Sequence, residues 1–378
     1  GERFMGDIEV HSKASDWRCH GHDRDPHYDR VILHVVWDGD DDIELRNGIK
    51  VTTLSLCRYL GDTLEDIRLQ LQLPVVPEEP CWHARRRVND QNVGSVLDEA
   101  GDERFRLKAS LFAAQLQHEQ PSQILFRAIM GALGYSKNKE PFEELADRLP
   151  LVSLEGIYRD KPAWERTLIL KALLLGKAGL LPLHDDRRLD EIWSRYGDGE
   201  HMDIRCWRVF RVRPDNHPVR RLIGAAHLVD RFAEIGLYRG IMESVGEAQS
   251  VTGQMEQLFM VNANMSSVHG ESTLIGRGRA REIVINVILP FTLAWSGANG
   301  QKRISRHAWA LYRSLPRSGE YGITRDLGRL LSGDHFSEVV SSARRQQGLI
   351  HIDKMFCRLR QCPVCPLAVD INASATVN

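Results

Sequence analysis

Residues near the N-terminus alternate between apolar and polar side chains with a period of two, which is typical of β-strands. Residues 4–11 follow this alternation, and residues 31–37 form a short β-branched run. Two further short runs flank Asn47 and Gly48, a pair that favours a two-residue hairpin turn. The pattern predicts a small mixed or antiparallel sheet in which Ile8 and Val10 face the core.

The apolar period changes to about 3.6 residues after a proline-rich stretch at 74–80, which indicates a linker followed by helices. Gln346, Gln347 and Gly348 are expected to end a helix, with the glycine as its C-cap. We expect the clearest helices at 106–116 and 124–133, and others at 140–148, 160–180, 187–196, 217–235, 237–245, 279–295, 304–314, 323–331 and 335–346.

These elements predict an α+β protein, with a small N-terminal mixed sheet followed by a large, mainly α-helical region. We place a β-rich lobe at 1–75, a linker at 76–90, a helical lobe at 91–350 and a cysteine-bearing tail at 351–378. A chain of 378 residues with 42% hydrophobic and 27% charged residues is long enough to bury two or three cores.

Membrane and secreted classes are not favoured by the composition. The most apolar stretch, 283–295, contains Asn286 and Pro290 and is shorter than the roughly 18 residues that a spanning helix needs. Seven cysteines are too few for a disulfide scaffold in so long a chain, and no leader-like segment opens it. We therefore expect a cytoplasmic protein with no membrane partner. The sequence does not determine its oligomeric state.

Charge is distributed unevenly along the chain. Residues 1–50 hold twelve acidic against seven basic side chains, whereas residues 201–350 hold twenty basic against thirteen acidic ones. The basic excess suggests nucleic acid as a polyanion partner, although solvated helix faces would give the same count. The candidate phosphate-binding residues are Arg220, Arg221, Arg277, Arg279 and Arg281.

Four ionisable side chains share one face of the first predicted strand, because side chains alternate along it. They are Asp7, Glu9, His11 and Lys13. Mg²⁺ or Mn²⁺ prefers carboxylate oxygens, so Glu9 with Asp7 or Asp16 would hold such a divalent cation. His11 or Lys13 would then orient or deprotonate water.

A second set of possible metal ligands lies in the loop after this strand and on the next strand. It consists of His20, His22, Asp25 and His34. A transition metal such as Zn²⁺ favours imidazole, whereas Mg²⁺ favours Glu9 with an aspartate. The alternative is that these histidines are structural, and the residue types do not decide between the two interpretations.

Three of the seven cysteines lie within nine residues near the C-terminus: Cys357, Cys362 and Cys365. Thiolates at this spacing suit Zn²⁺ or an iron–sulfur cluster, both of which need four ligands. The alternative is a set of thiols without a metal. The sequence leaves the fourth ligand open among His351, Cys19, Cys57, Cys81 and Cys206.

Several common catalytic motifs do not occur in the sequence. It contains no phosphate-binding Gly-X-X-X-X-Gly-Lys-Ser/Thr loop, no Gly-X-Ser-X-Gly elbow and no His-Glu-X-X-His pair. Gly276, Arg277, Gly278 and Arg279 resemble a phosphate-cradling turn at a helix start, but are too short for a dinucleotide fingerprint.

The opening motif resembles a bacterial family known as domain of unknown function 2851. It comprises residues 6–11, 15–17, 20–22 and 31–36, and later stretches at 134–142, 216–221, 276–290 and 346–350 agree, as does the terminal cysteine cluster. The resemblance covers nearly the whole chain and implies no activity, because the family has none assigned. Its members carry an upstream Gly-Pro-Asp-Phe-like segment that this sequence lacks, so we expect an N-terminal truncation.

Residues 9–13 are also similar to half of the Asp…Asp/Glu-X-Lys arrangement of restriction-endonuclease-like nucleases. His11 stands where that class has lysine, and the partner acid would lie in the absent segment. The similarity implies a metal-dependent nuclease that hydrolyses phosphodiesters in DNA or RNA. Two alternatives stay open: a non-catalytic nucleic-acid- or protein-binding adaptor, and a Zn-dependent hydrolase that uses the His-rich loop.

Overall fold

The structure is a computed structural model that describes residues 5–39, 41–58, 90–210, 212–247, 253–264, 271–319, 324, 327 and 336–367. The chain divides into two compact units, Gly1–Glu78 and Glu79–Asn378. The predicted linker and most of the expected helix at 323–331 lie outside the described residues. We describe each unit by itself.

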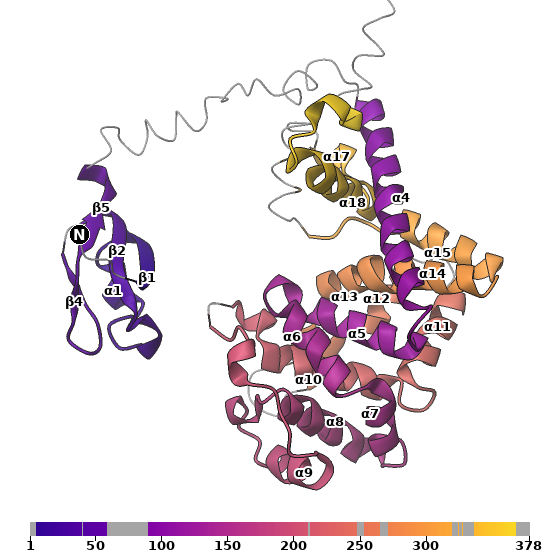
Figure 1. Cartoon of the computed structure of the whole chain (residues 1–378), viewed down its shortest axis with the longest axis horizontal. Coiled ribbons are helices and arrows are strands. Elements are labelled where there is room, and N and C mark those ends of the chain that lie inside the picture. The colour runs from indigo at the N-terminus through magenta and orange to yellow at the C-terminus, as the bar shows by residue number, and fades with distance from the viewer. Residues whose placement is uncertain are drawn as a thin grey trace, which may run out of the picture. The chain divides into compact units, whose positions relative to one another are not determined.

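The N-terminal unit is built on a parallel sheet (Figure 1). Strands β1 (Asp7–Lys13), β2 (Val31–Asp38) and β5 (Thr53–Ser55) pair in the order β1-β2-β5. The connection from β1 to β2 passes through α1 (Asp16–Cys19) and η1 (Pro26–Tyr28), the kind of crossover that parallel strands require. A short 3₁₀ turn, η2 (Leu56–Arg58), follows β5.

Antiparallel pairing in this unit is confined to a separate hairpin. Strands β3 (Ile43–Glu44) and β4 (Lys50–Val51) pair across the predicted turn, where Gly48 has a φ of +79°. The α+β class and the hairpin are therefore confirmed. The expectation of a mixed or antiparallel main sheet is wrong, because the crossover makes all three of its strands parallel.

The face of β1 that turns inward is the polar one. Ile8 and Val10 are 54% and 65% exposed, whereas Glu9 and His11 are largely covered. The prediction that Ile8 and Val10 face the core is therefore wrong, although the alternation itself is correct. The buried side chains around which the unit packs include Trp17, His34 and Val36, so β1 contributes its imidazole to the interior in place of its apolar side chains.

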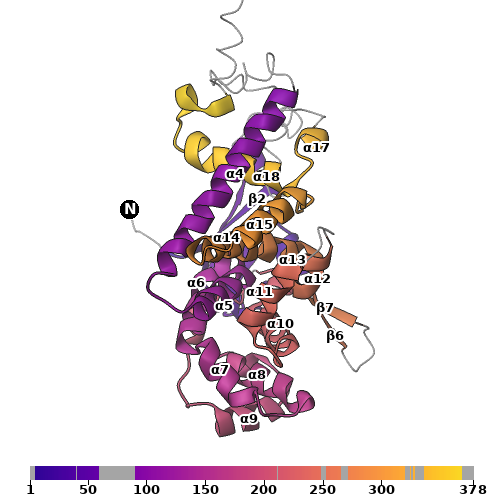
Figure 2. The same cartoon turned by 90° about the vertical axis from the view of Figure 1, so that its right-hand side faces the viewer.

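The second unit is mainly helical, and its described residues include the antiparallel pair β6 and β7 (Figures 1 and 2). Its elements are α4 (Asp90–Gln115), α5 (Pro121–Leu133), α6 (Tyr135–Arg148), α7 (Leu151–Tyr158), α8 (Ala163–Lys177), η3 (Leu181–Leu183), α9 (Arg188–Tyr196), η4 (Ile204–Cys206), η5 (Pro214–Asn216), α10 (Pro218–Arg231), α11 (Leu237–Glu247), α12 (Gln254–Phe259), β6 (Val261–Asn264), β7 (Glu271–Ile275), α13 (Arg277–Ile283), η6 (Val284–Ile288), α14 (Leu289–Ala298), α15 (Lys302–Ser314), α17 (Phe336–Val339), α18 (Ala343–Ile352), η8 (Asp353–Cys357) and η9 (Cys362–Val364).

Most of the expected helices are confirmed, although the one expected at 106–116 begins sixteen residues earlier, as α4 at Asp90. Other errors fall on short elements. The pattern missed α7 and α12, which are only 8 and 6 residues long, and the antiparallel pair β6 and β7. The expected helix at 279–295 is present as α13 and α14 joined by the π-helical segment η6. No helix in the described ranges is both long and apolar enough to cross a membrane.

Glycines allow α18 to pack closely on α4, which runs beside it in both views (Figures 1 and 2). A Cβ atom added to Gly348 would lie 2.0 Å from the carbonyl oxygen of Leu97, and one added to Gly101 would lie 2.2 Å from that of Arg344. Gly348 lies inside α18, so the expected C-cap there is wrong. The expected helix at 335–346 is instead split into α17 and α18.

Ion pairs of Asp102 also link α4 to α18 and to α15. Asp102 on α4 accepts hydrogen bonds from Arg344 at 2.7 Å and from Arg313 at 2.8 Å. Burial raises the pKa of the Asp102 carboxyl, but the hydrogen bonds from both guanidinium groups outweigh burial and leave the pKa below its ordinary value. Asp102 is therefore ionised at neutral pH and can pair with both guanidinium groups.

Candidate metal centre

Three histidines of the N-terminal unit meet beside the sheet. His11 lies on β1, His20 ends α1, and His22 follows it in the next turn. Gly21 between them has a φ of +72°, a left-handed conformation that glycine adopts without strain. The backbone N–H groups of Gly21 and His22 donate to the carbonyl oxygens of Arg18 and Trp17, so the loop folds back over α1.

The ring nitrogens of these histidines are close enough to share one ion. His20 Nδ1 lies 3.2 Å from His11 Nε2, and one ligand atom from each of the three residues lies within 4.8 Å of the others. Two nitrogens on a tetrahedral Zn²⁺ would be roughly 3.3 Å apart, given Zn–N bonds of about 2.0–2.1 Å. In the part of the chain that the structure describes, no other His, Cys, Asp or Glu side chains form such a group of three.

A chain of hydrogen bonds fixes the tautomer of His11. Thr53 donates its hydroxyl proton to the carbonyl oxygen of Asp41 at 2.8 Å, so its oxygen accepts the Nδ1–H of His34 at 3.1 Å. His34 Nε2 must then be the acceptor for the Nδ1–H of His11, which is 3.0 Å away. The Nε2 of His11 is left with a lone pair directed at His20, which is the form that binds a metal.

His34 therefore lies behind the three histidines and outside the group whose ligand atoms lie within 4.8 Å of one another. Its side chain is fully buried on β2, opposite Thr53 of β5 in the sheet register. Burial lowers the pKa of His34, and the neighbouring His11 lowers it further, so the ring stays neutral as the hydrogen-bond chain requires. Thr53 was not a sequence candidate, because only the pairing of β2 with β5 brings it to His34.

Aromatic rings form the wall behind the group. The rings of Trp17 and His34 are 5.6 Å apart, and those of Trp17 and His22 are 5.4 Å apart. His22 also packs on Tyr28, with ring centroids 3.8 Å apart, while the indole N–H of Trp17 donates to the carbonyl oxygen of Glu44. An aromatic wall of this kind would limit solvent access to an ion held by the three histidines.

The acidic candidates are not all at the site. Glu9 Oε1 lies 3.8 Å from His11 Nε2, and both side chains are mostly shielded from solvent. Asp7 and Lys13 are exposed, and Asp16 accepts the backbone N–H of Lys13 at 3.1 Å.

Asp25, the remaining acidic candidate, caps the 3₁₀ turn η1. It accepts the backbone N–H of His27 at 2.9 Å and contacts that ring at 2.7 Å. The backbone hydrogen bond first, and then the side-chain one, hold the pKa of Asp25 below its usual value. Of the predicted residues, the structure thus gathers Glu9, His11, His20, His22 and His34, and places Asp25 elsewhere.

The terminal cysteines do not form a ready site in the described residues. Cys357 ends η8, Cys362 begins η9, and Cys365 is buried in an apolar cluster with Val93 and Leu349. The three thiols belong to no group of ligand atoms within 4.8 Å in the ranges described. The metal or cluster predicted there stays a prediction, and Cys81 lies outside the described residues.

The predicted arginines have different environments. Arg281 donates to Glu256 at 2.6 Å, and Arg277 on the same helix is 66% exposed. Arg221 is buried and donates to the carbonyl oxygen of Leu274. Their binding to nucleic acid stays a prediction. The three side chains differ in partners and exposure and do not form one continuous exposed basic surface.

The other two of these arginines lie close to Arg221. Arg220 donates to the carbonyl oxygen of Thr273 at 2.7 Å. The guanidinium group of Arg279 stacks 3.5 Å above the ring of Tyr135 and donates to the carbonyl oxygen of Ala132. Both side chains line a pocket in the helical unit, together with Arg221.

Removal of the Thr53 hydroxyl tests the hydrogen-bond chain. Thr53→Val keeps the side-chain shape but takes away the acceptor for His34, so His11 is no longer held in the binding tautomer. We expect the affinity for Zn²⁺ to fall about 10–100-fold, as is usual for loss of an outer partner. Competition with a chromophoric chelator measures this. Thr52→Val, at the exposed neighbouring position, should leave the affinity unchanged. Equal affinities in Thr53→Val and wild type would contradict the assignment.

Comparison with known protein families identifies the family to which the chain belongs. Neither the curated proteins nor the solved structures contain a match to the chain. The family model described as "Protein of unknown function (DUF2851)" matches residues 1–320 of the 378, a span that includes the histidine group. The match extends over well more than half of the sequence. The chain therefore belongs to this family of proteins of unknown function, DUF2851.

Proposed function

We propose that the N-terminal unit binds one transition-metal ion, Zn²⁺ in the first place, and uses it to hydrolyse a phosphate ester. The observation that supports this most strongly is the convergence of one ligand atom each from His11, His20 and His22 within 4.8 Å. Three protein ligands with a fourth position open are the donor set of catalytic zinc sites.

The donor chemistry favours Zn²⁺ over the Mg²⁺ or Mn²⁺ of the nuclease hypothesis. Magnesium takes oxygen ligands in near-octahedral geometry. Asp7, Glu9 and Asp16 do not come together as one group of ligand atoms within 4.8 Å among the described residues, whereas the three imidazoles do. Imidazole nitrogen is a good ligand for zinc and a poor one for magnesium.

The residues around the three histidines would have different roles in hydrolysis. A bound Zn²⁺ would supply a Lewis acid that lowers the pKa of water. In this proposal Glu9 would take up the proton of the attacking water, because its carboxylate lies 3.8 Å from His11 Nε2 and is shielded from bulk solvent. Thr53 and His34 keep His11 in the tautomer that can bind. Lys13 is exposed and has no part in this scheme.

The substrate class rests on the similarity of residues 9–13 to nucleases of the Asp…Asp/Glu-X-Lys type. Nucleic-acid phosphodiesters are accordingly the first substrates to test. The adaptor hypothesis makes a different prediction, namely that the protein binds metal and nucleic acid without cleaving the latter.

Hydrolysis by the full-length protein tests the proposal. We expect the Zn²⁺-loaded protein to cleave bis(p-nitrophenyl) phosphate or an oligonucleotide, and the Mg²⁺-loaded protein to be much less active. Glu9→Gln should lower the rate constant for hydrolysis at least about 100-fold while zinc stays bound, since general-base catalysis contributes about 10²–10⁴-fold.

Asp7→Asn is the matched control, because Asp7 lies on the same strand but is exposed. It should retain the wild-type rate. Zinc-loaded protein that cleaves none of these substrates would favour the adaptor. Full activity in Glu9→Gln would remove Glu9 from the mechanism.

A further inference from the structure

Two cavities adjoin one another in the helical unit. The first, which we call the arginine pocket, has a volume of about 380 Å³, and its polar walls include Arg213, Arg220, Arg221 and Ser318. The second, the apolar pocket, has a volume of about 460 Å³ and lies among α4, α5, α6, α13 and η6. The two cavities share the side chains of Tyr135, Arg279 and Glu282.

Buried polar atoms without hydrogen-bond partners gather at the arginine pocket. Such atoms are rare in folded proteins, because leaving them unpaired costs free energy. Arg221 and Ser318 are only 6% and 5% exposed, yet Arg221 Nε and Ser318 Oγ have no hydrogen-bond partner in the part of the chain that the structure describes. Arg220 Nε, which lies 3.7 Å from the carboxylate of Asp215, and Glu282 Oε1 are likewise buried without a hydrogen-bond partner among the described residues.

These unpaired atoms indicate which chemical groups a ligand of the arginine pocket would carry. Two guanidinium N–H groups and one hydroxyl can donate to a group rich in acceptor oxygens, whereas the Glu282 carboxylate needs a donor. The pocket is lined by four arginines but only two acidic residues, Asp215 and Glu282. This excess of positive charge favours a negatively charged ligand. A phosphate monoester meets both conditions, because it has several acceptor oxygens and, when singly ionised, one P–O–H donor.

Backbone strain lies at the wall between the two cavities. Tyr135 has a φ of +58°, which is uncommon for any residue other than glycine, and strained residues of this kind cluster at functional sites. The guanidinium carbon of Arg279 lies 3.5 Å from the centroid of the Tyr135 ring. Tyr135 thereby holds Arg279 between the pockets, where it can contact both halves of a ligand.

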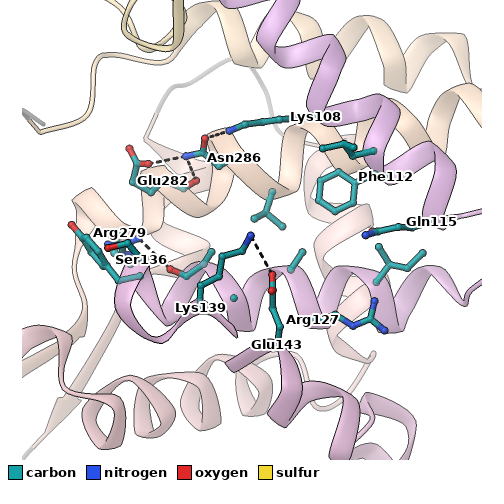
Figure 3. A pocket seen from close by; sticks show the side chains of 17 residues that line it. Lys108, Phe112, Gln115, Arg127, Ser136, Lys139, Glu143, Arg279, Glu282 and Asn286 are labelled. Carbon is teal, nitrogen blue, oxygen red and sulfur yellow. Dashed lines mark hydrogen bonds and ion pairs between the residues drawn. The ribbon is translucent and has the colours of Figure 1, made fainter. Parts of the chain in front are cut away.

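The apolar pocket is suited to the body of the same ligand. Phe112, Ile124 and Val287 contribute apolar wall, and a polar chain from Lys108 to Asn286 to Glu282 borders one side (Figure 3). Asn286 lies in η6, and π-helical turns inside α-helices occur frequently at functional sites. Lys139 and Glu143 face this chain from α6 on the opposite side (Figure 3).

We infer that the helical unit binds an organic phosphate monoester, with the phosphate in the arginine pocket and an apolar body in the apolar pocket. Both cavities fall within the volume range of small-molecule sites. A nucleic-acid backbone would instead follow exposed basic residues, and Arg281 is occupied by Glu256. The inference is independent of the metal centre, since all its residues belong to the other unit.

Calorimetric titration of the full chain tests this with phenyl phosphate and inorganic phosphate as probes. We expect phenyl phosphate to bind more tightly than inorganic phosphate. Arg220→Gln should weaken both about tenfold, which corresponds to one charge-assisted hydrogen bond. Ser318→Ala should weaken both to a smaller extent. Arg277→Gln is the matched control, because Arg277 lies on α13 but lines neither pocket.

A second variant separates the two halves of the site. Ala128 lines the apolar pocket only, so Ala128→Leu should remove the advantage of phenyl phosphate and leave inorganic phosphate binding unchanged. The thermal unfolding midpoint without ligand shows that each variant folds. Absence of binding by wild type, or equal affinities in Arg220→Gln, Ser318→Ala and wild type, would overturn the inference. An oligonucleotide that binds more tightly than phenyl phosphate and depends on Arg277 would replace it with an open nucleic-acid surface.

Discussion

Replacing His20 with alanine should lower the affinity of the protein for Zn²⁺ about a hundredfold. Structural zinc sites with four ligands bind with an apparent free energy of about 10–16 kcal/mol, so one ligand accounts for roughly 3 kcal/mol, or a factor of about 100. His20 is exposed at the end of α1, so its loss should leave the unit folded. Competition titration with a chromophoric chelator gives the affinity and the number of ions bound.

His27→Ala is the control for a general effect of losing an exposed imidazole in the same unit. His27 pairs with Asp25 and lies outside the three-histidine group. Its variant should bind Zn²⁺ as tightly as wild type. An equal loss of affinity in both variants, or no loss in His20→Ala, would show that the ion is held elsewhere.

The Gly348→Ala substitution should destabilise the helical unit by about 3 kcal/mol. The added methyl group would lie 2.0 Å from the carbonyl oxygen of Leu97, which is backbone and cannot rotate away. The two helices would have to separate, and overpacking of this kind costs about 1–3 kcal/mol or more. Separation would also weaken the pairing of Arg344 with Asp102 across the same interface.

Gly156→Ala is the matched comparison, because a Cβ added to Gly156 on α7 meets nothing within 4 Å. There the higher helix propensity of alanine should stabilise the protein by about 0.5–1 kcal/mol. Urea unfolding of both variants measures the two free energies of unfolding. A Gly348→Ala protein as stable as wild type would mean that α18 does not approach α4 so closely.

The sequence predicts the fold class well, because the apolar period changes from two to 3.6 in a way that any packing must respect. It predicts the histidine group in part, because His11, His20, His22 and His34 lie within twenty-four positions of one another. The period alone does not say which face of β1 is buried. A strand with imidazoles on one side and Ile8 on the other fits a core on either side.

Contacts between distant segments could not be predicted. Thr53 reaches His34 only through the pairing of β2 with β5. Lys108 and Asn286 are separated by 178 residues and meet only when α4 packs beside η6. A glycine inside α18 has the same local signature as a C-cap, and only the packing on Leu97 distinguishes the two. Such features depend on tertiary packing, which a single sequence does not encode in its periodicity.

X-ray absorption at the zinc edge, on full-length protein loaded with one equivalent of Zn²⁺, distinguishes a histidine centre from binding at the terminal cysteines. We expect a first shell of nitrogen and oxygen at about 2.0–2.1 Å, with the outer scattering of three imidazole rings. His20→Ala should remove one ring from that pattern. A shell dominated by sulfur at about 2.3 Å would place the ion at the terminal cysteines and contradict the histidine centre.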